Sequence, residues 1–184
     1  MSAITNRGRH WVLVGLMGTG KSTVGRILAE RTARPYVDSD ARVEAASGLD
    51  AAGVAAAHGI VALHRLELQV LEAALQSPDP SVIGSAASVV DTAAGRALLA
   101  TADEVVWLQV PLDVLIERVA EGGDHRPFGD NRVAVLREQA ASRRPLYEQV
   151  ATVTVDADRK PEAVAAEILA AVARAPTRPE RHDG

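Results

Sequence analysis

Residues 15–22 have the sequence GLMGTGKS, which fits the phosphate-binding pattern G-x-x-x-x-G-K-[ST]. Glycines in such a loop let backbone N–H groups converge on phosphate oxygens, in conformations that other residues rarely adopt. Lys21 can reach the outer phosphates as a mobile point charge, and the Ser22 hydroxyl can bind a Mg²⁺ ion that bridges two phosphates. An apolar run at residues 10–14 precedes the loop and a helical pattern at residues 21–31 follows it, as the motif requires. The pattern therefore predicts a site for nucleotide phosphates, and a glycine-rich turn without a ligand is the alternative.

A pair of carboxylates, Asp38 and Asp40, follows a second apolar segment at residues 36–38. Residues two apart in a strand point to the same side, so both side chains are expected to face the crevice beyond the strand end. One could hold Mg²⁺ through water, while the other orients or deprotonates an acceptor hydroxyl. A pair of turn aspartates, one of which caps the following helix, is the alternative. The nearby phosphate loop favours the functional interpretation.

Segments with strand and helix patterns alternate along the chain. Apolar runs predict strands at residues 10–14, 36–38, 81–84, 104–110 and 151–155. Helical spacing and chain breakers predict helices at residues 21–31, 41–46, 50–58, 60–75, 91–100, 111–121, 132–149 (interrupted at Pro145) and 161–174. This alternation predicts an α/β fold with a parallel sheet, helices on both faces, and ligands beyond the carboxyl ends of the strands.

The chain of 184 residues is about the length of one domain, which we place at residues 1–174. A polar, glycine-bearing loop lies at about residues 122–131, and a polar tail at residues 175–184 is expected to be disordered. Arg7 and Arg9 resemble the start of a signal peptide only superficially, because the apolar run that follows them is too short.

The composition excludes several classes of protein. Cysteine is absent, which rules out disulfides, zinc ribbons, iron–sulfur clusters and thiol catalysis. The net charge is −4 and aromatic residues make up only 3%, which argues against a nucleic-acid partner. No segment reaches the length of a membrane span. We expect a cytoplasmic, monomeric protein without nucleic-acid or membrane partners.

Four motifs, in this order, resemble those of the shikimate kinases, which are small P-loop kinases. They are the phosphate loop and its flanks at residues 14–26, a D-x-D motif at residues 37–40, an arginine of the lid at Arg126-Pro127, and an R-x-P-L-Y motif at residues 143–147. The resemblance covers about residues 10–174. It implies a three-layer sandwich of the P-loop NTPase, nucleoside-monophosphate-kinase-like type, with a five-stranded parallel sheet and a mobile lid.

The same resemblance implies ATP and Mg²⁺ as cofactors, a small-molecule acceptor, and roles for matching residues. Nucleotide contacts would come from Gly18, Thr19, Gly20, Lys21, Ser22, Thr23, Arg118 and Arg126, and metal contacts from Ser22 and Asp38. Acceptor contacts would come from Asp40, His64, Ala86 and Arg143, whose guanidinium suits a carboxylate. Lys21, Asp40 and Arg126 would act in catalysis. The spacing from Arg118 to Arg126 is one residue longer than in the family, and surface salt bridges are the alternative for the arginines.

The acceptor half of the sequence departs from the family pattern. The family has a G-E-x-x-F-R segment, and here Ile60, Leu63 and His64 occupy its glutamate, aromatic and arginine positions. A neutral histidine can donate one hydrogen bond but cannot form a bidentate fork. Arg65 lies about 100° further around the helix, so it is no automatic substitute.

A second departure follows the third predicted strand. The family has a G-G-G run there, and this chain has Ser85, Ala86 and Ala87. Each alanine adds a methyl group where the acceptor approaches closely, and a positive φ at these positions would be costly. The Ser85 hydroxyl could contact the acceptor instead.

The phosphate-donor half therefore looks intact and the acceptor half altered. The favoured hypothesis is ATP- and Mg²⁺-dependent phosphorylation of shikimate to shikimate 3-phosphate. A kinase for another small hydroxylated metabolite, and an inactive nucleotide-binding homologue that acts as a regulator, are alternatives. A gluconate-kinase-like or nucleotide-monophosphate-kinase-like enzyme is ranked lower, because the D-x-D and R-x-P-L-Y motifs favour the shikimate kinase pattern.

Overall fold

A five-stranded parallel sheet forms the centre of the computed structural model, which describes residues 10–121 and 131–174. The strand order is β2-β3-β1-β4-β5. The strands are β1 (Trp11–Val14), β2 (Tyr36–Asp38), β3 (Val82–Gly84), β4 (Glu104–Gln109) and β5 (Val153–Asp156). The predicted α/β fold with a parallel sheet is thereby confirmed.

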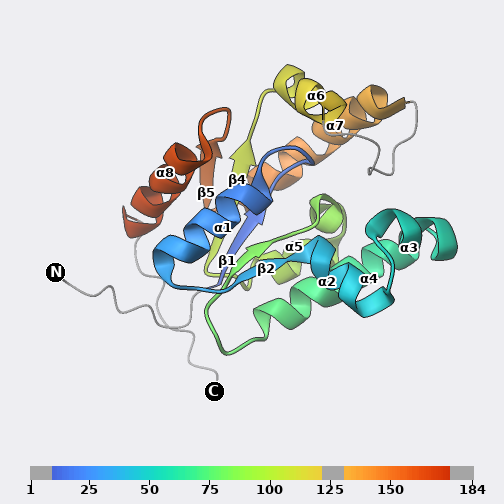
Figure 1. Ribbon diagram of the computed structural model, residues 1–184, viewed down its shortest axis with the longest axis horizontal. Helices are drawn as coiled ribbons and strands as arrows, with labels where there is room; N and C mark the ends of the chain where they lie inside the picture. Colours follow the sequence, from blue (N-terminus) through green and yellow to red (C-terminus); the bar gives the residue numbers. More distant parts are fainter. Residues whose placement is uncertain (1–9, 122–130, 175–184) are drawn as a thin grey trace.

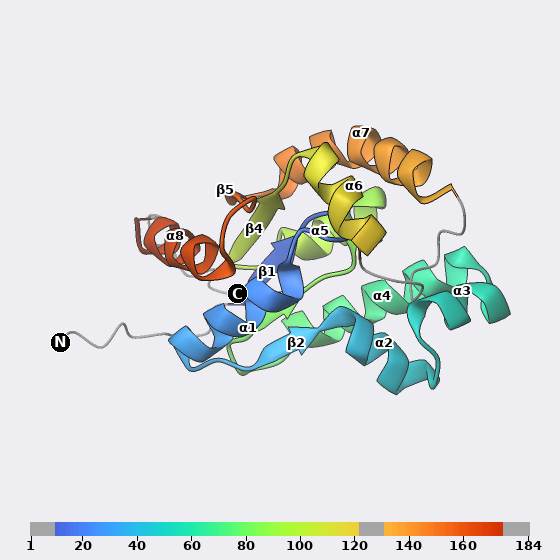
Figure 2. The same ribbon diagram turned by 45° about the horizontal axis from the view of Figure 1, so that its top comes forward.

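Helices cover both faces of this sheet (Figure 1). They are α1 (Lys21–Thr32), α2 (Ser39–Ser47), α3 (Ala51–His58), α4 (Ile60–Leu75), α5 (Ala93–Leu99), α6 (Leu112–Glu121), α7 (Arg132–Val150) and α8 (Pro161–Arg174), with a 3₁₀ helix, η1 (Ala87–Asp91). Helices α1 and α8 pack against each other on one face, while α5 and α7 lie behind the sheet (Figure 1). Helices α2, α3 and α4 form a group beside the β2 edge, as the turned view shows (Figure 2).

The strand register brings the predicted motifs to one level of the sheet. Gly84 at the end of β3 pairs with both Leu13 of β1 and Asp38 of β2. Each of these strands is followed directly by a candidate segment: the phosphate loop, Asp40, and residues 85–87. Parallel pairing thus carries three segments that are far apart in sequence to one edge.

The core is built from aliphatic side chains, as the low aromatic content requires. All four residues of β1 are buried, and so are the side chains of Leu28 on α1 and Ile168 on α8. Two glycines, Gly25 and Gly84, make room for the ring of Tyr36, since a Cβ atom at either position would clash with it. The ring of Tyr36 therefore packs between helix α1 and strand β3.

Three local predictions were wrong in detail. Helix α2 begins at Ser39 rather than at residue 41, because the Asp38 side chain caps it. Pro145 lies within α7 and does not interrupt it, since Arg143 and Tyr147 are buried on either side and hold the helix in place. The helix predicted at residues 91–100 begins at Ala93 instead, because Asp91 belongs to the 3₁₀ helix η1, which no sequence pattern predicted. Thr92 caps α5 by accepting a hydrogen bond from the Gly95 amide at 3.0 Å.

Several predictions fall on parts of the chain that the structure does not describe. The expected lid, most of residues 122–131, and the expected disordered tail at residues 175–184 lie outside the described residues. Within residues 10–121 and 131–174, no helix has both the length and the apolar composition that crossing a bilayer requires.

Candidate active site

The phosphate loop joins β1 to α1 through two glycines in left-handed conformations. Gly18 has φ 82° and Gly20 has φ 89°, values that favour glycine over residues with a Cβ. Gly20 is also the N-cap of α1, so no side chain caps the first amides of that helix. Nζ of Lys21 donates hydrogen bonds to the carbonyl oxygens of Gly15 and Leu16, at 2.9 and 3.0 Å. The loop thus presents uncapped amides, a helix N-terminus and a lysine, which together form an anion site.

A cleft of about 940 Å³ opens in front of this loop. Its lining includes most of the residues that the sequence analysis singled out: Gly18, Gly20, Lys21, Ser22, Thr23, Asp40, His64, Ala86, Arg118 and Arg143. The structure therefore brings predicted nucleotide residues and predicted acceptor residues into one cavity. Thr19 and Asp38 are not among its lining residues, and Arg126 lies outside the described residues.

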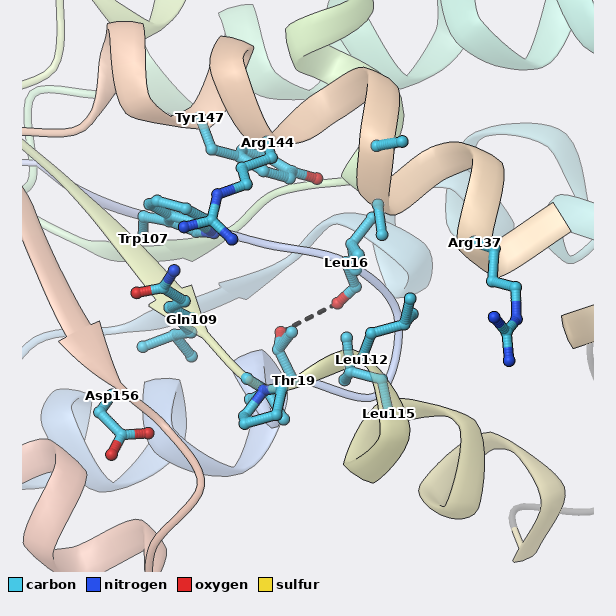
Figure 3. Close-up of a pocket in the computed structure, with 15 residues that line it drawn as sticks. Leu16, Thr19, Trp107, Gln109, Leu112, Leu115, Arg137, Arg144, Tyr147 and Asp156 are labelled. Atoms are coloured by element: carbon cyan, nitrogen blue, oxygen red, sulfur yellow. Dashed lines mark hydrogen bonds between the residues drawn. The ribbon is translucent and has the colours of Figure 1, made fainter. Parts of the chain in front are cut away.

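Thr19 lines a second cavity of about 600 Å³ between β4 and α7 (Figure 3). Its hydroxyl donates a hydrogen bond to the carbonyl oxygen of Leu16 at 2.9 Å, and the side chain is buried. Trp107 and Tyr147 form the apolar wall of this cavity, with their rings stacked at 5.8 Å between centroids. The Thr19 side chain therefore stabilises the phosphate loop on the side away from the cleft. A nucleotide in the cleft could contact only the backbone of Thr19.

The two aspartates after β2 do not share one side of a strand, so that inference was wrong. Asp38 ends β2, and its Oδ1 accepts a hydrogen bond from the amide of Asp40 at 3.1 Å. Oδ2 of Asp38 lies 3.6 Å from the guanidinium of Arg26. Asp40 sits in the first turn of α2 and lines the cleft instead. The capping alternative thus holds for Asp38, while Asp40 faces the site.

The environment of Asp40 favours its protonated form. Burial raises the pKa of Asp40, the negative charge of Asp38 raises it further, and the positive charge of Lys21 opposes both effects. A carboxyl group whose pKa moves toward neutrality is suited to exchange a proton with a hydroxyl near physiological pH. Asp40 therefore has the placement and the electrostatics of a general base.

Arg118 of α6 bridges the phosphate loop and the segment after β5. Its Nη2 donates to Oδ1 of Asp158 at 3.0 Å, and its Nη1 donates to the carbonyl oxygen of Gly18 at 3.4 Å. The side chain remains about one third exposed, and it lines the cleft. Asp158 was not predicted from the sequence. It lies in a polar turn between β5 and α8 and matches no motif.

One face of helix α4 lines the cleft. Ile60, Leu63, His64 and Glu67 all line it, at the spacing of one helical face. Arg65, which the sequence analysis treated as no automatic substitute for the family arginine, is exposed and does not line the cleft.

Glu67 is a site residue that the sequence analysis missed. It is only 7% exposed, and it accepts a hydrogen bond from the hydroxyl of Ser88. Burial raises the pKa of Glu67, partly opposed by the Ser88 hydrogen bond. A glutamate four residues after Leu63, on the apolar face of a helix, is the signal that could have identified it.

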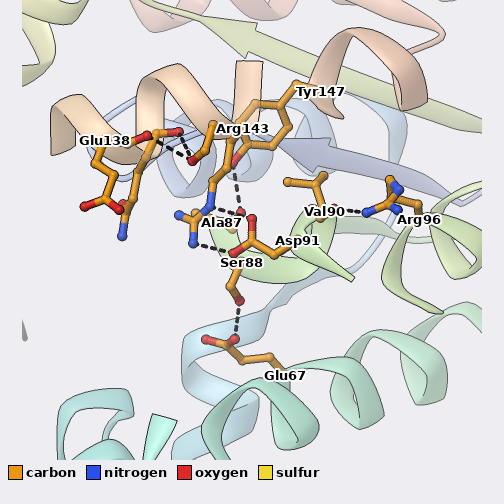
Figure 4. Close-up of polar contacts among 11 residues, drawn as sticks. Glu67, Ala87, Ser88, Val90, Asp91, Arg96, Glu138, Arg143 and Tyr147 are labelled. Carbon is orange, nitrogen blue, oxygen red and sulfur yellow. Dashed lines mark hydrogen bonds and ion pairs between the residues drawn. The ribbon is translucent and has the colours of Figure 1, made fainter. Parts of the chain in front are cut away.

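Helix α7 contacts η1 through the arginine and the tyrosine of the R-x-P-L-Y motif (Figure 4). Nε and Nη2 of Arg143 donate to the two carboxylate oxygens of Asp91, at 2.9 and 2.7 Å. One turn later, the hydroxyl of Tyr147 donates to the carbonyl oxygen of Ala87 at 2.9 Å. The arginine and the tyrosine of the motif are four residues apart, so both side chains lie on one face of α7 and contact η1.

The segment after β3 avoids the positive φ values that would be costly for its alanines. Ala86 has φ −61°, and Ala33 is the one residue other than glycine with a positive φ in the described part of the chain. Ser85 lines the cleft, but its side chain is buried and its hydroxyl donates to the carbonyl oxygen of Leu13 at 3.1 Å, so that hydroxyl hydrogen already has a partner at the end of β1. Ala86 lines the cleft with a backbone conformation that any residue can adopt.

The oxygen donors near the phosphate loop fit Mg²⁺. Ser22 lines the cleft with a hydroxyl, a hard oxygen ligand, whereas the Asp38 carboxylate caps α2, lies 3.6 Å from Arg26 and would reach the ion through water. No group of three or more His, Cys, Asp or Glu side chains in the described ranges could hold a metal alone. Such a sparse protein donor set is typical of Mg²⁺ that is bound largely through substrate phosphates and water.

Comparison with known proteins identifies a family from the sequence. A family model for shikimate kinase matches residues 17–173. A shikimate kinase of Symbiobacterium thermophilum is 41% identical over 162 residues, covering 86% of this chain and 92% of its own length. One of Paramagnetospirillum magneticum is 36% identical over 165 residues, covering 88% and 83%. The solved structure of shikimate kinase from Acinetobacter baumannii in complex with shikimate has a TM-score of 0.83 and 29% identity, over 90% of this chain and 93% of that one.

Proposed function

The chain belongs to the shikimate kinase family, and we propose that it transfers the γ-phosphoryl group of ATP to the 3-hydroxyl of shikimate. The observation that carries this proposal is the shared cleft, in which the phosphate loop, Asp40 and Arg143 meet. A phosphate site, a candidate base and a carboxylate-binding cation are the three groups that phosphorylation of a hydroxy acid requires.

The phosphate loop and its neighbours bind the nucleotide in this proposal. Backbone amides from Gly18 to Thr23 surround the phosphates at the N-terminus of α1. Lys21 exchanges its carbonyl partners in the loop for phosphate oxygens, and Arg118, which contacts the Gly18 carbonyl oxygen, lies beside the nucleotide. Arg126 would close over the phosphates, as its match to the lid motif implies.

The chemical step is an in-line displacement without a covalent enzyme intermediate. Asp40 accepts the proton of the acceptor hydroxyl while that oxygen bonds to the γ-phosphorus and the bond from phosphorus to the bridging oxygen of ADP breaks. Lys21 stays at the phosphates and neutralises charge on the transferred group. Mg²⁺, held by Ser22 and Asp38, would neutralise charge on the phosphates. Positioning and charge therefore account for catalysis.

The acceptor lies between α4 and α7. Arg143 binds its carboxylate, His64 donates a single hydrogen bond, and the backbone at Ala86 lines its ring. We also propose that the protein is a cytoplasmic monomer with no nucleic-acid partner.

A second candidate is the phosphorylation of another small hydroxylated metabolite. The observation that favours it is the α4 face of the cleft, which carries Ile60 and His64 where the family has a glutamate and an arginine. A less anionic acceptor would suit that face.

A substrate panel separates the two candidates. The protein is incubated with ATP, Mg²⁺ and one acceptor at a time: shikimate, its methyl ester, quinate and gluconate. Phosphorus NMR of the product identifies the phosphorylated hydroxyl. Turnover of shikimate with the highest kcat/KM supports the first candidate, and a higher kcat/KM for any of the other three acceptors supports the second.

A further inference from the structure

We propose that Asp91 is a positioning residue for the acceptor, because it holds one edge of the Arg143 guanidinium and leaves the other edge for the acceptor carboxylate. This inference rests on the proposed function. It assigns the orientation of Arg143 to a residue that lies in no sequence motif and that is placed by the 3₁₀ helix η1.

The two residues form a bidentate pair on a buried cation. Nε and Nη2 of Arg143 lie 2.9 and 2.7 Å from Oδ1 and Oδ2 of Asp91. The Arg143 side chain is 9% exposed and that of Asp91 is 32% exposed. Within the described ranges, both of the hydrogen bonds that the guanidinium donates go to Asp91. A bidentate pair fixes the plane of the guanidinium as well as its position.

The pair does not use up the donors of Arg143. A guanidinium has five N–H groups, and a side-on pair occupies the Nε–H and one N–H of Nη2. Both N–H groups of Nη1 and the second one of Nη2 remain. One N–H of Nη1 and the remaining N–H of Nη2 form the end-on fork, which matches a second carboxylate. Arg143 also lines the cleft, so a second carboxylate can reach this fork from the cavity.

Asp91 is itself held in place from two sides (Figure 4). The Ser88 hydroxyl donates to Glu67 of α4, and the Tyr147 hydroxyl donates to the carbonyl oxygen of Ala87 from α7. Helix η1 therefore connects the two helices that wall the acceptor half of the cleft. The Asp91 carboxylate is fixed relative to both walls and can fix Arg143 in turn.

Within the described part of the cleft lining, Arg143 is the one arginine on the acceptor side. Among the described residues that line the cleft, Lys21 and Arg118 belong to the phosphate-loop side, and His64 replaces the arginine of α4. Recognition of the acceptor carboxylate thus depends on the orientation of one guanidinium. Loss of that orientation should weaken the binding of the carboxylate and leave the phosphoryl transfer itself intact.

The test compares Asp91→Asn with wild type in steady-state kinetics. An asparagine side chain has one oxygen and no charge, so it cannot form the bidentate pair. The expected result is a rise of about 10-fold in KM for shikimate, with kcat and the KM for ATP each within about 3-fold of wild type. Asp91→Glu restores the charge and should recover part of the loss.

Two comparisons distinguish positioning from a general structural role. Glu148→Gln is the matched control, since it removes the carboxylate partner of Arg144 in an exposed pair on the same helix. It should leave all constants unchanged. The methyl ester of shikimate has no carboxylate, so Asp91→Asn should raise its KM far less than that of shikimate.

Specific outcomes would overturn the proposal. An unchanged KM for shikimate in Asp91→Asn shows that Arg143 needs no partner, and a lowered KM shows that Asp91 competes with the acceptor. An equal rise for the methyl ester shows a structural defect. If Asp91→Asn fails to fold, Asp91→Glu provides the test, because its longer side chain shifts the ion pair with Arg143. A KM for shikimate equal to that of wild type in Asp91→Glu would then show that Asp91 does not position Arg143. Absence of shikimate turnover by wild type overturns the proposed function itself.

Discussion

Oδ1 of Asp38 accepts a hydrogen bond from the backbone amide of Asp40 at 3.1 Å, and this contact assigns different tasks to the two carboxylates. Asp38 starts helix α2, and the turn that it caps carries Asp40 into the cleft. The side chain of Asp40 is thereby placed among Lys21 and Ser22 rather than beside Asp38.

Asp40→Asn should abolish most of the activity. The amide cannot accept the proton of the acceptor hydroxyl, so kcat should fall about 10²- to 10⁴-fold while the protein still binds ATP. Glu44→Gln, an exposed acid on the same helix, is the control and should keep full activity. Steady-state kinetics and nucleotide-binding calorimetry provide the measurement. A kcat within 10-fold of wild type would remove Asp40 from the role of base.

The pH dependence of kcat should report the raised pKa of Asp40. A base works only when it is deprotonated, so kcat should fall as the pH decreases through a value above the ordinary 3.8 of an aspartate. The measurement is kcat from pH 4.5 to 9 with saturating ATP and acceptor. A profile that stays flat down to pH 4.5 would contradict this assignment.

Glu67→Gln should increase the free energy of unfolding at neutral pH. Burial raises the pKa of Glu67 above its ordinary 4.5. At a pH between 4.5 and the raised pKa, the folded protein therefore keeps a proton that the unfolded chain has released. The stability contributed by the protonated group is complete below pH 4.5 and is lost as the pH rises through the raised pKa. Glutamine does not ionise and avoids this loss.

Urea unfolding at pH 4 and pH 8 measures this effect. The gain from Glu67→Gln should appear at pH 8 and be much smaller at pH 4. Glu72→Gln, an exposed glutamate on the same helix, should show no such difference between the two pH values. Equal effects of Glu67→Gln at both pH values would mean that ionisation of Glu67 does not affect stability.

Asp158→Ala should weaken the binding of ATP without affecting the acceptor. Asp158 holds Nη2 of Arg118 at 3.0 Å, and without it the arginine loses the partner that directs it along the cleft. The KM for ATP should rise about 3- to 10-fold, as expected for the loss of one partly exposed charged contact. The KM for shikimate should stay constant. Asp113→Asn, an exposed acid on α6, is the control, and a constant KM for ATP would show that Asp158 is not needed.

Arg143→Ala should mainly raise the KM for a carboxylate acceptor, by about 10²-fold. The change also leaves Asp91 without its cation, so the double variant with Asp91→Ala removes both charges and controls for the loss of stability. Kinetics with shikimate and its methyl ester give the comparison. An unchanged KM for shikimate would exclude Arg143 from the acceptor site.

Local patterns predicted the strands, most helices and the phosphate loop because each depends on neighbouring residues alone. The apolar run at residues 11–14 reads as a buried strand, and the glycines at positions 18 and 20 adopt the left-handed conformations that the motif requires. His64 and Ala86 were assigned to the acceptor site by the resemblance to the shikimate kinases, and both line the cleft.

Features that depend on contacts across the fold could not be predicted in this way. The pairing of Arg143 with Asp91 joins residues 52 positions apart. Pro145 was expected to interrupt α7, but burial of Arg143 and Tyr147 offsets the hydrogen bond that a proline removes. Each of these outcomes was decided by packing rather than by sequence pattern.

The most direct test of the central claim is a coupled assay of ADP release with ATP and Mg²⁺, in the presence and absence of shikimate. Lys21→Ala serves as the background, since it removes the cation of the phosphate loop. The account predicts ADP release that depends on shikimate and falls by at least about 10²-fold in Lys21→Ala. Binding of ATP without any dependence of ADP release on shikimate, or near-normal turnover by Lys21→Ala, would contradict it.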